Sequence, residues 1–228
     1  IDLYMNQAVF QNLNIYDNLI KNNIVGIDFS GGGYGARVHS VNIYDNIFFN
    51  NSTSGINIGQ IYGEPWQGND IPNYPLQVYR NILNKNGIIW NYGGGVGGVR
   101  SRITNNLITN INGDGIKFTG GTGRTDSIAY NLIQANGHSI YLEDGYSDPS
   151  NKRFISNTFT GNPSSEMIHI FGSSHELNNN NFYNTSGIVI RNYSSENANA
   201  ESNYWGTVSE EEIGDLIYDY NDDFELGT

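Results

Sequence analysis

Seven residues in the second half of the chain carry side chains that can transfer protons or bind an anion. Three of them directly follow an isoleucine, and three others precede the same isoleucines by two positions. Histidine, tyrosine and carboxylates act as general acids and bases, and lysine can neutralise a carboxylate. If each isoleucine occupies the same place in a repeated unit, the seven side chains meet on one face: Asp114, Lys117, His138, Tyr141, Glu143, Glu166 and His169.

A repeated unit is visible in the sequence. An asparagine between apolar residues, followed by Gly-Ile-x-apolar, recurs about every 25 residues, most clearly at residues 15–29 and 43–58. A period in the twenties is typical of stacked repeats, in which no single unit buries its own apolar face. The first two copies centre on Asn18 and Asn46, and later copies on Asn81, Asn106, Asn131, Asn157, Asn181 and Asn203.

Each unit contains three short segments of β-branched or aromatic residues, such as 41–43, 47–49 and 56–58. These segments are too short for helices and favour strands. Stacked coils of this kind form three parallel sheets, because the coil itself connects each strand to the next. We expect the asparagine to lie at the corner between the second and third strands in a left-handed conformation, with stacked amides forming a ladder.

The repeat resembles the right-handed parallel β-helix proteins, a group that includes pectate-lyase-like enzymes, alginate lyases, C5-epimerases and many surface proteins. Residues 203–206 and the capping-box pattern of Ser209 and Glu212 resemble the closing segment of bacterial and archaeal surface β-helices. The resemblance implies an all-β, single-stranded right-handed parallel β-helix of about eight coils over residues 1–206. Residues 207–228 form a cap of the same domain, with a short helix over the last coil.

In the resembled enzymes the sugar lies along the first parallel sheet, which here is the Gly-Ile strand. Alternation directs the residue after each isoleucine outward. In the last coil this rule places Ile188 inward, Val189 outward and Arg191 in a second outward rank with Glu143. We expect Arg191 to bind substrate.

An enzyme that cleaves or epimerises uronic acids must neutralise a carboxylate, remove the C5 proton and protonate a second position. Lys117 is the candidate neutraliser, His138 or His169 the base, and Tyr141 the acid or second base. The alternative is a solvated sheet face, with pairs such as Lys117 and Asp114. A glycoside hydrolase, for which Asp114 and Glu166 would lie roughly 9 to 10 Å apart, ranks below elimination or epimerisation.

The longest loop, residues 59–75, contains aromatic residues of the kind that stack on sugar rings, namely Trp66, Tyr62 and Tyr74. They support a rival hypothesis, a non-catalytic glycan-binding module, although Trp66 can equally pack within its own loop. Carboxylates at 143–148 and 221–223 leave Ca²⁺ open as a cofactor, but neither segment has a defined Ca²⁺-binding spacing. No residue is assigned as a metal ligand.

The composition excludes some functions. A formal charge of −12 and a pI near 4.5 disfavour nucleic acid and anionic lipid as partners. The chain has no cysteine and no apolar run long enough to insert into a membrane. We expect an extracellular or cell-surface protein that acts on polysaccharide. Because the chain starts on a segment like the tail of a repeat, we also expect missing upstream coils, and end-to-end stacking in a structural spacer is a third possibility.

Overall fold

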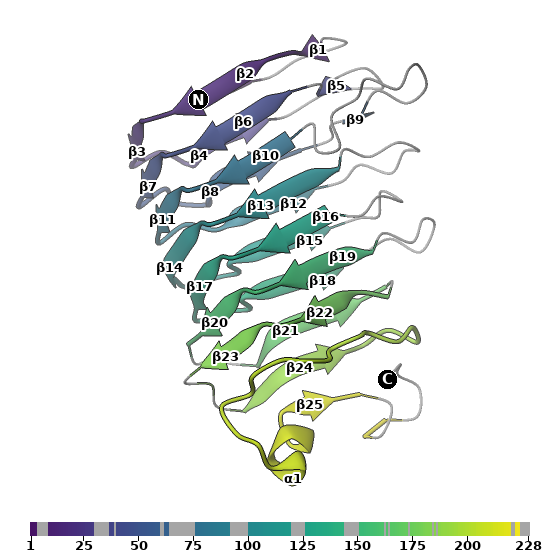
Figure 1. Ribbon diagram of the computed structural model, residues 1–228. Coiled ribbons are helices and arrows are strands. Elements are labelled where there is room, and N and C mark those ends of the chain that lie inside the picture. Colours follow the sequence, from purple (N-terminus) through teal and green to yellow (C-terminus); the bar gives the residue numbers. More distant parts are fainter. Residues whose placement is uncertain are drawn as a thin grey trace.

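The protein is a parallel β-solenoid in the computed structural model, with its turns stacked from the N-terminal to the C-terminal end (Figure 1). In the described part of the chain, no helix is long and apolar enough to cross a bilayer. The structure describes residues 1–3, 9–29, 37–38, 40–59, 62–63, 76–91, 100–119, 126–143, 151–161, 163, 165–172, 174–183, 185, 187–219 and 222–223.

Three long parallel sheets form the walls of the solenoid, as the sequence predicts. The entry sheet contains β2 Leu13–Tyr16, β6 Val41–Tyr44, β10 Leu76–Tyr79, β13 Ser101–Thr104, β16 Asp126–Ala129, β19 Lys152–Ile155 and β22 Glu176–Asn178. The middle sheet contains β3 Leu19–Lys21, β7 Ile47–Phe49, β11 Ile82–Asn84, β14 Leu107–Ile111, β17 Leu132–Ala135, β20 Thr158–Thr160 and β23 Asn181–Tyr183. The eight-stranded sheet contains β4 Val25–Phe29, β8 Ser54–Ile58, β12 Ile88–Asn91, β15 Ile116–Thr119, β18 Ile140–Glu143, β21 Glu166–Phe171, β24 Ile188–Asn192 and β25 Ile217–Tyr218. A small sheet joins β1 Val9–Phe10, β5 Arg37–Val38 and β9 Tyr62–Gly63.

The solenoid has about six turns, and the expected eight is wrong. The entry sheet and the middle sheet have seven strands each, and six full turns connect the first strand of a sheet to its last. The last asparagine copy adds only isolated bridges, Glu176 with Asn199 and Asn181 with Tyr204, instead of complete strands. Each asparagine copy therefore marks a corner of the solenoid, but not every corner belongs to a complete turn.

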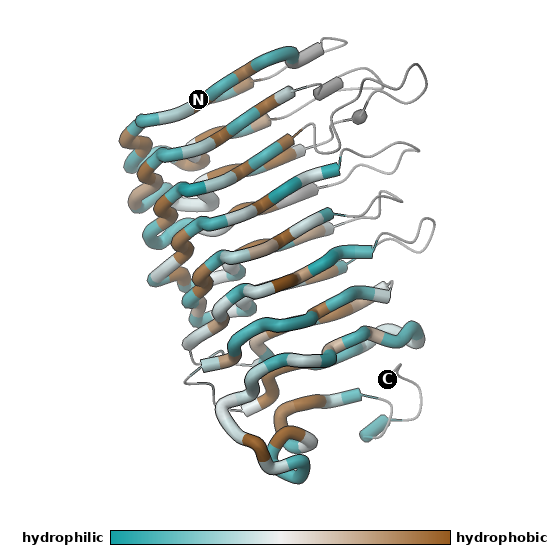
Figure 2. Tube along the Cα trace, viewed as in Figure 1, coloured by the Kyte–Doolittle hydropathy of each residue, from teal (hydrophilic) through white to brown (hydrophobic). Residues whose placement is uncertain are grey.

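The core is a continuous apolar column inside the three sheets. The isoleucines of the Gly-Ile strands pair in register from one turn to the next, and those from Ile27 to Ile168 are fully buried. Apolar residues recur at matching places in successive turns (Figure 2). The glycine before the isoleucine is required by close stacking, since a Cβ on Gly26 would lie 2.4 Å from the carbonyl oxygen of Gly55.

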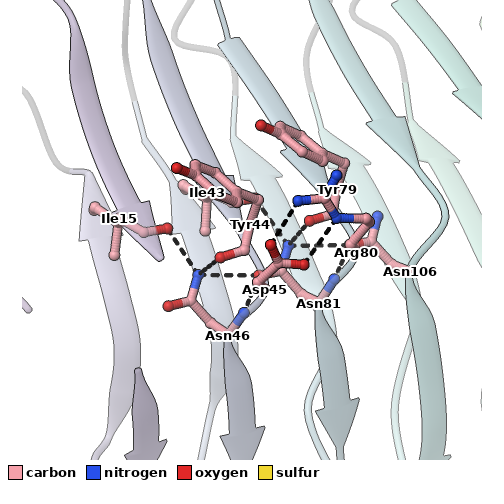
Figure 3. Close-up of polar contacts among 9 residues, drawn as sticks. All are labelled: Ile15, Ile43, Tyr44, Asp45, Asn46, Tyr79, Arg80, Asn81 and Asn106. Atoms are coloured by element: carbon pink, nitrogen blue, oxygen red, sulfur yellow. Dashed lines mark hydrogen bonds and ion pairs between the residues drawn. The ribbon is translucent and has the colours of Figure 1, made fainter. Parts of the chain in front are cut away.

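The asparagine ladder exists, but its place in the turn differs from the expectation. Asn46 lies between β6 and β7, the first and second strands of its unit, and not between the second and third. Its Nδ2 donates to Asn81 Oδ1 (3.1 Å) and to the carbonyl of Ile15 in the preceding turn (2.8 Å) (Figure 3). Asn81 repeats the pattern with Asn106 (Figure 3).

The left-handed residue is the one before each ladder asparagine. Asp45 and Arg80 have φ of 55° and 54°, and Tyr130 has φ of 58°. The ladder asparagine is selected by its amide hydrogen bonds, since its own φ is not positive. Near the C-terminal end the ladder member is Asn180, whose Oδ1 accepts from Asn157, and Asn181 starts β23 instead.

A second, shorter asparagine stack follows β3, β7 and β11 and was not predicted. Asn23 donates to Asn51 Oδ1 (3.2 Å), and Asn51 donates to Asn86 Oδ1 (2.8 Å). Asn86 precedes Ile88 by two positions, as Asp114 precedes Ile116, but it is buried in the stack and is therefore a structural residue.

Buried charges occupy the interior beneath the entry sheet. Lys152 Nζ lies 3.2 Å from Asp126 Oδ2, and both side chains are fully buried. Ser101 donates to Asp126 Oδ1 from its amide and its hydroxyl, and the Lys152 amide donates to His175 Nδ1. A buried ion pair needs such added hydrogen bonds to offset desolvation.

Tyrosines stack on the outer face of the entry sheet. Tyr16, Tyr44 and Tyr79 have ring centroids 5.1 and 5.0 Å apart and nearly parallel planes. Arg80 lies against this stack and pairs with Asp45 (Figure 3). Because Tyr44 has a ring stacked on each of its faces, it offers only its edge to a ligand.

The register of the last coil differs from the expectation by two residues. Ile168 pairs with Ile190, which is buried, whereas Ile188 pairs with Glu166 at the strand entry. Gly187 copies the Gly-Ile signature, but its φ of 76° places it in the turn. Val189 is therefore buried, and Arg191 takes the outward position that the sequence analysis gave to Val189.

The C-terminal segment closes the eight-stranded sheet (Figure 1). Helix α1 (Glu210–Gly214) is capped by Ser209, whose Oγ accepts from the Glu212 amide at 3.3 Å, as predicted. The capping box is incomplete, because Glu212 bonds to Thr207 instead of the Ser209 amide. After the helix, the carbonyl of Leu216 accepts from β24 amides, so it is this segment that covers the strand edge.

Candidate functional site

The strands of the eight-stranded sheet bring the predicted chemical residues together. Lys117 pairs with Tyr141, Tyr141 with His169, and His169 with Arg191, on β15, β18, β21 and β24. Adjacent parallel strands lie about 4.8 Å apart, so neighbouring side chains of this row start about that far from each other. We call the whole group the outer cluster: Asp114, Lys117, His138, Tyr141, Glu143, Glu166, His169 and Arg191.

A second rank lies at the entry to the same strands and forms a chain of contacts. Asp114 Oδ1 lies 2.7 Å from His138 Nδ1, and His138 Nε2 lies 3.3 Å from Glu166 Oε1. Glu166 is 2% exposed, and its Oε2 accepts from the Ser165 hydroxyl. The ring of His138 is therefore held between two carboxylates on neighbouring turns.

His169 connects the two ranks. Its Nδ1 lies 2.7 Å from Glu166 Oε1, and its ring stacks on Tyr141 with centroids 4.4 Å apart. Tyr193 packs on His169 as well, with centroids 4.6 Å apart. The imidazole is thus fixed by a carboxylate and by two aromatic rings, which restricts its orientation.

Cations lie at the two ends of the row. Lys117 Nζ is 3.9 Å from Asp114 Oδ2 and 4.5 Å from the centre of the Tyr141 ring. At the other end, Arg191 donates to the Tyr193 hydroxyl (3.0 Å), and its Nε lies 3.9 Å from Glu166 Oε2. Both side chains are partly exposed, 33% for Lys117 and 28% for Arg191, although Arg191 Nε itself is buried. Each side chain therefore keeps accessible surface for an anion.

Glu143 is peripheral to the cluster. It is exposed and accepts a 3.3 Å hydrogen bond from the Tyr141 hydroxyl. Asp114 and Glu166 do not flank an open space, because His138 contacts both of them. A glycoside hydrolase binds the glycosidic bond between its two carboxylates. His138 occupies that position here, so the arrangement disfavours hydrolysis.

The surroundings shift the pKa values of the cluster in different directions. The hydrogen bond to Asp114 raises the pKa of His138, and burial lowers the pKa of His169. Burial alone would raise the pKa of Asp114 and Glu166, but hydrogen bonds from His138, Ser165 and His169 hold both carboxyl pKa values below their usual range. Burial, followed by the charge of Glu143, raises the pKa of Tyr141, so its hydroxyl stays protonated.

A groove of about 580 Å³ adjoins the cluster at the corner between the middle sheet and the eight-stranded sheet. Its lining includes Asp114 and Lys117, and also Lys85, Asn51 and Thr53. It therefore runs from the outer cluster towards the N-terminal turns. Two lysines line a concave surface on a protein whose net charge is strongly negative.

Sequence reasoning missed three residues of the site. Tyr193 follows Arg191 by two positions, so strand alternation would have placed it outward once the register of β24 was known. Ser165 directly precedes Glu166 in the sequence, and it lies outside both ranks. Tyr218, whose ring lies 4.7 Å from the Arg191 guanidinium, comes after the helix and outside the repeat, where no periodic signal predicts it.

The predicted aromatic platform lies largely outside the described residues. Trp66 and Tyr74 are not among them, and of Tyr62 only the backbone in β9 is described. Asp144 and Asp148, in the acidic segment 143–148 that left Ca²⁺ open as a cofactor, also lie outside the described residues.

Comparison of the chain with protein-family models, with curated proteins and with solved structures finds no match. Of the resemblance to pectate-lyase-like proteins, the structure supports the parallel β-solenoid. A shared fold does not by itself imply a shared function.

Proposed function

We propose that the outer cluster removes the C5 proton of a uronic acid residue in an acidic polysaccharide, which leads to β-elimination or C5 epimerisation. In elimination, the C5–H electron pair forms the C4–C5 double bond and the C4 oxygen leaves with a proton. In epimerisation, a proton returns to C5 from the other face. Both reactions need a cation at the carboxylate, a base and an acid. Acidic polysaccharides of this class lie outside cells, so the proposal includes an extracellular or cell-surface location.

Lys117 and Arg191 are suited to hold carboxylates of different uronate residues, since three strand spacings of about 4.8 Å separate them. They lie at opposite ends of a row of four consecutive strands, with Tyr141 and His169 between them. Lys85 and Lys117 line the adjoining groove, which offers room for neighbouring sugars of the same chain. These local cations counter the repulsion that a net charge of −12 would otherwise exert on an anionic substrate.

His169 is the better base of the two histidines. With its Nδ1 proton donated to Glu166, its Nε2 carries the lone pair that can accept a proton, and the carboxylate orients the ring and strengthens the base. His138 contacts a carboxylate through each ring nitrogen, so neither nitrogen is directed to a substrate.

Tyr141 is placed to serve as the acid. Its ring is stacked on the base, and its hydroxyl donates to the exposed Glu143. Acid and base on adjacent strands can therefore reach neighbouring atoms of one sugar ring.

The row Lys117–Tyr141–His169–Arg191 carries the proposal, and a turnover screen tests it. Alginate, polygalacturonate and hyaluronan would be incubated with the protein, and the ultraviolet absorbance of new unsaturated uronates recorded. Tyr141→Phe and His169→Gln should each lower the rate about 10² to 10⁴-fold. The matched control is Glu176→Gln, an exposed carboxylate on the entry sheet, which should keep the rate. Wild-type rates in both site variants would overturn the proposal.

Glycan binding without turnover is the second candidate, favoured by the groove with its two lysines. Retention of an acidic glycan that is weakened by Lys85→Gln, with no change in the glycan, would support a binding module in place of an enzyme.

A further inference from the structure

We infer that His138, Glu166 and His169 form a binding site for a divalent transition-metal ion of the zinc class. One ligand atom from each of the three side chains lies within 4.8 Å of the others, and within the described part of the chain this is the one such group of three. The inference goes beyond the proposed reaction and does not require turnover.

The two histidine nitrogens converge on one carboxylate oxygen. His138 Nε2 is 3.3 Å from Glu166 Oε1, and His169 Nδ1 is 2.7 Å from the same oxygen. Bonds of about 2.0 to 2.1 Å to zinc at angles between octahedral and tetrahedral require ligand separations of about 3.0 to 3.4 Å. The first pair already has this separation, and the second needs to open by less than about 1 Å.

The lone pairs of His138 and Glu166 call for a cation between them. Asp114 Oδ1 lies 2.7 Å from His138 Nδ1 and accepts its proton, so a neutral ring directs the lone pair of Nε2 at the Glu166 carboxylate. Two lone pairs that face each other at 3.3 Å repel unless a proton or a metal ion lies between them. A metal ion satisfies both and leaves His138 neutral.

The outer contacts match those of protein metal sites. Metal-binding histidines commonly donate their second ring N–H to a carboxylate, as His138 does to Asp114. Ser165 donates to the second oxygen of Glu166, which leaves Oε1 for the ion. His138 lies two residues before β18, and Glu166 and His169 both lie on the adjacent strand β21, so all three ligands are held by one sheet.

The donor set selects the kind of ion. Two imidazoles and one carboxylate suit Zn²⁺, Ni²⁺ or Co²⁺, whereas Ca²⁺ requires six to eight oxygen ligands. Three protein ligands leave an open position, which a water molecule or a carboxylate of a ligand can fill. The ion would bind Nδ1 of His169 and so change the tautomer that the proposed base needs. Zinc is therefore expected to inhibit the proposed reaction.

Calorimetric titration of the chelator-treated protein with ZnCl₂ tests the inference. We expect one ion per chain, with binding at least 100-fold tighter than that of CaCl₂. Glu166→Gln should abolish binding, and Asp114→Asn, which keeps all three ligands, should weaken it about 10 to 100-fold. The matched control Glu176→Gln should bind as the wild type does.

A second readout keeps the test independent of how the variants fold. Co²⁺ added to the wild-type protein should give the visible absorption of a site with nitrogen ligands, and Zn²⁺ should displace it. Absence of saturable binding, equal affinity for Ca²⁺, or unchanged binding in Glu166→Gln would overturn the metal site. Zinc binding without any action on uronates would overturn only the proposed reaction, and turnover without zinc binding would overturn only the metal site.

Discussion

Replacing a buried ladder asparagine should cost far more stability than replacing the exposed one at the end of the same ladder. Asn131 lies near the centre of the ladder and is 2% exposed. Its Oδ1 accepts from the Asn106 amide and from Asn106 Nδ2, both at 3.0 Å. Its Nδ2 donates to Ile103, Ala129 and Asn157.

The magnitude follows from the groups that the change leaves unpaired. Asn131→Ala removes the acceptor of two donors of Asn106, which is itself buried. An unsatisfied buried group costs about 1 to 3 kcal/mol, so the free energy of unfolding should fall by about 2 to 6 kcal/mol. In Asn18→Ala the lost Nδ2 donor is on an exposed residue, and the Asn18 amide keeps Asn46 Oδ1 as its acceptor. That change should cost less than about 1 kcal/mol.

Urea unfolding followed by circular dichroism would compare the two variants with the wild type. Because repeat proteins can unfold in parts, the midpoints would be compared first, and hydrogen exchange would locate the loss. Equal losses in the two variants, or a loss below 1 kcal/mol in Asn131→Ala, would refute the conclusion that the buried amides hold the turns together.

Three further predictions concern residues away from the outer cluster. Lys152→Met should lower the free energy of unfolding in urea by about 3 to 5 kcal/mol, because it leaves the carboxylate of Asp126 buried without its cation. The double variant with Asp126→Leu should recover most of this loss. An equal loss in the double variant would contradict the explanation. Burial lowers the pKa of His175 to about 3. Below the usual histidine pKa near 6.5, the unfolded chain therefore binds a proton that the folded chain does not. The contribution of His175 to the free energy of unfolding should fall by about 2 kcal/mol from pH 7.5 to 5. His175→Gln should show a shallower loss of stability over that range, and an unchanged pH profile would argue against the burial. Tyr130→Asn should raise stability by about 0.5 to 1 kcal/mol in thermal unfolding, because the exposed tyrosine adopts a left-handed conformation that asparagine tolerates better; a lower melting temperature would contradict this reason.

The repeat predicted most of the fold because each level of the sequence agrees with it. Alternation within 41–44 and 47–49, glycine at the tight stacking positions and asparagine at the corner all specify the same turn. The corner itself was placed wrongly, because two turns per coil contain asparagines and both lie near left-handed residues. Only the hydrogen bonds show that Asn46 and Asn51 belong to separate stacks.

The outer cluster was predicted where the repeat is regular. Counting from each isoleucine placed Lys117, Tyr141 and His169 in one row, and the register of β15, β18 and β21 confirms it. Counting failed in the last coil, where Gly187 forms a turn that resembles the start of a strand. Arg191 therefore lies in the row next to His169, and not in the second outward rank with Glu143.

Contacts that cross from one rank to the other could not be predicted by counting. The sequence shows that Asp114, His138 and Glu166 share a rank, but only side-chain rotamers bring Glu166 to His169 on its own strand. Buried charges were missed for a different reason. Lys152 and Asp126 occupy inward positions that alternation reserves for apolar residues, and a sequence alone does not show that they pair.

Loss of the C5 proton from a uronic acid is the direct readout of the proposed reaction. Each acidic polysaccharide would be incubated with the protein in D₂O, and the H5 signal followed by nuclear magnetic resonance. We expect at least one polysaccharide to lose its H5 signal, either with a new C4–C5 double bond or with deuterium at C5. We also expect His169→Gln to prevent the loss. An H5 signal that persists in every acidic polysaccharide, or that disappears equally fast with His169→Gln, would contradict the proposed reaction.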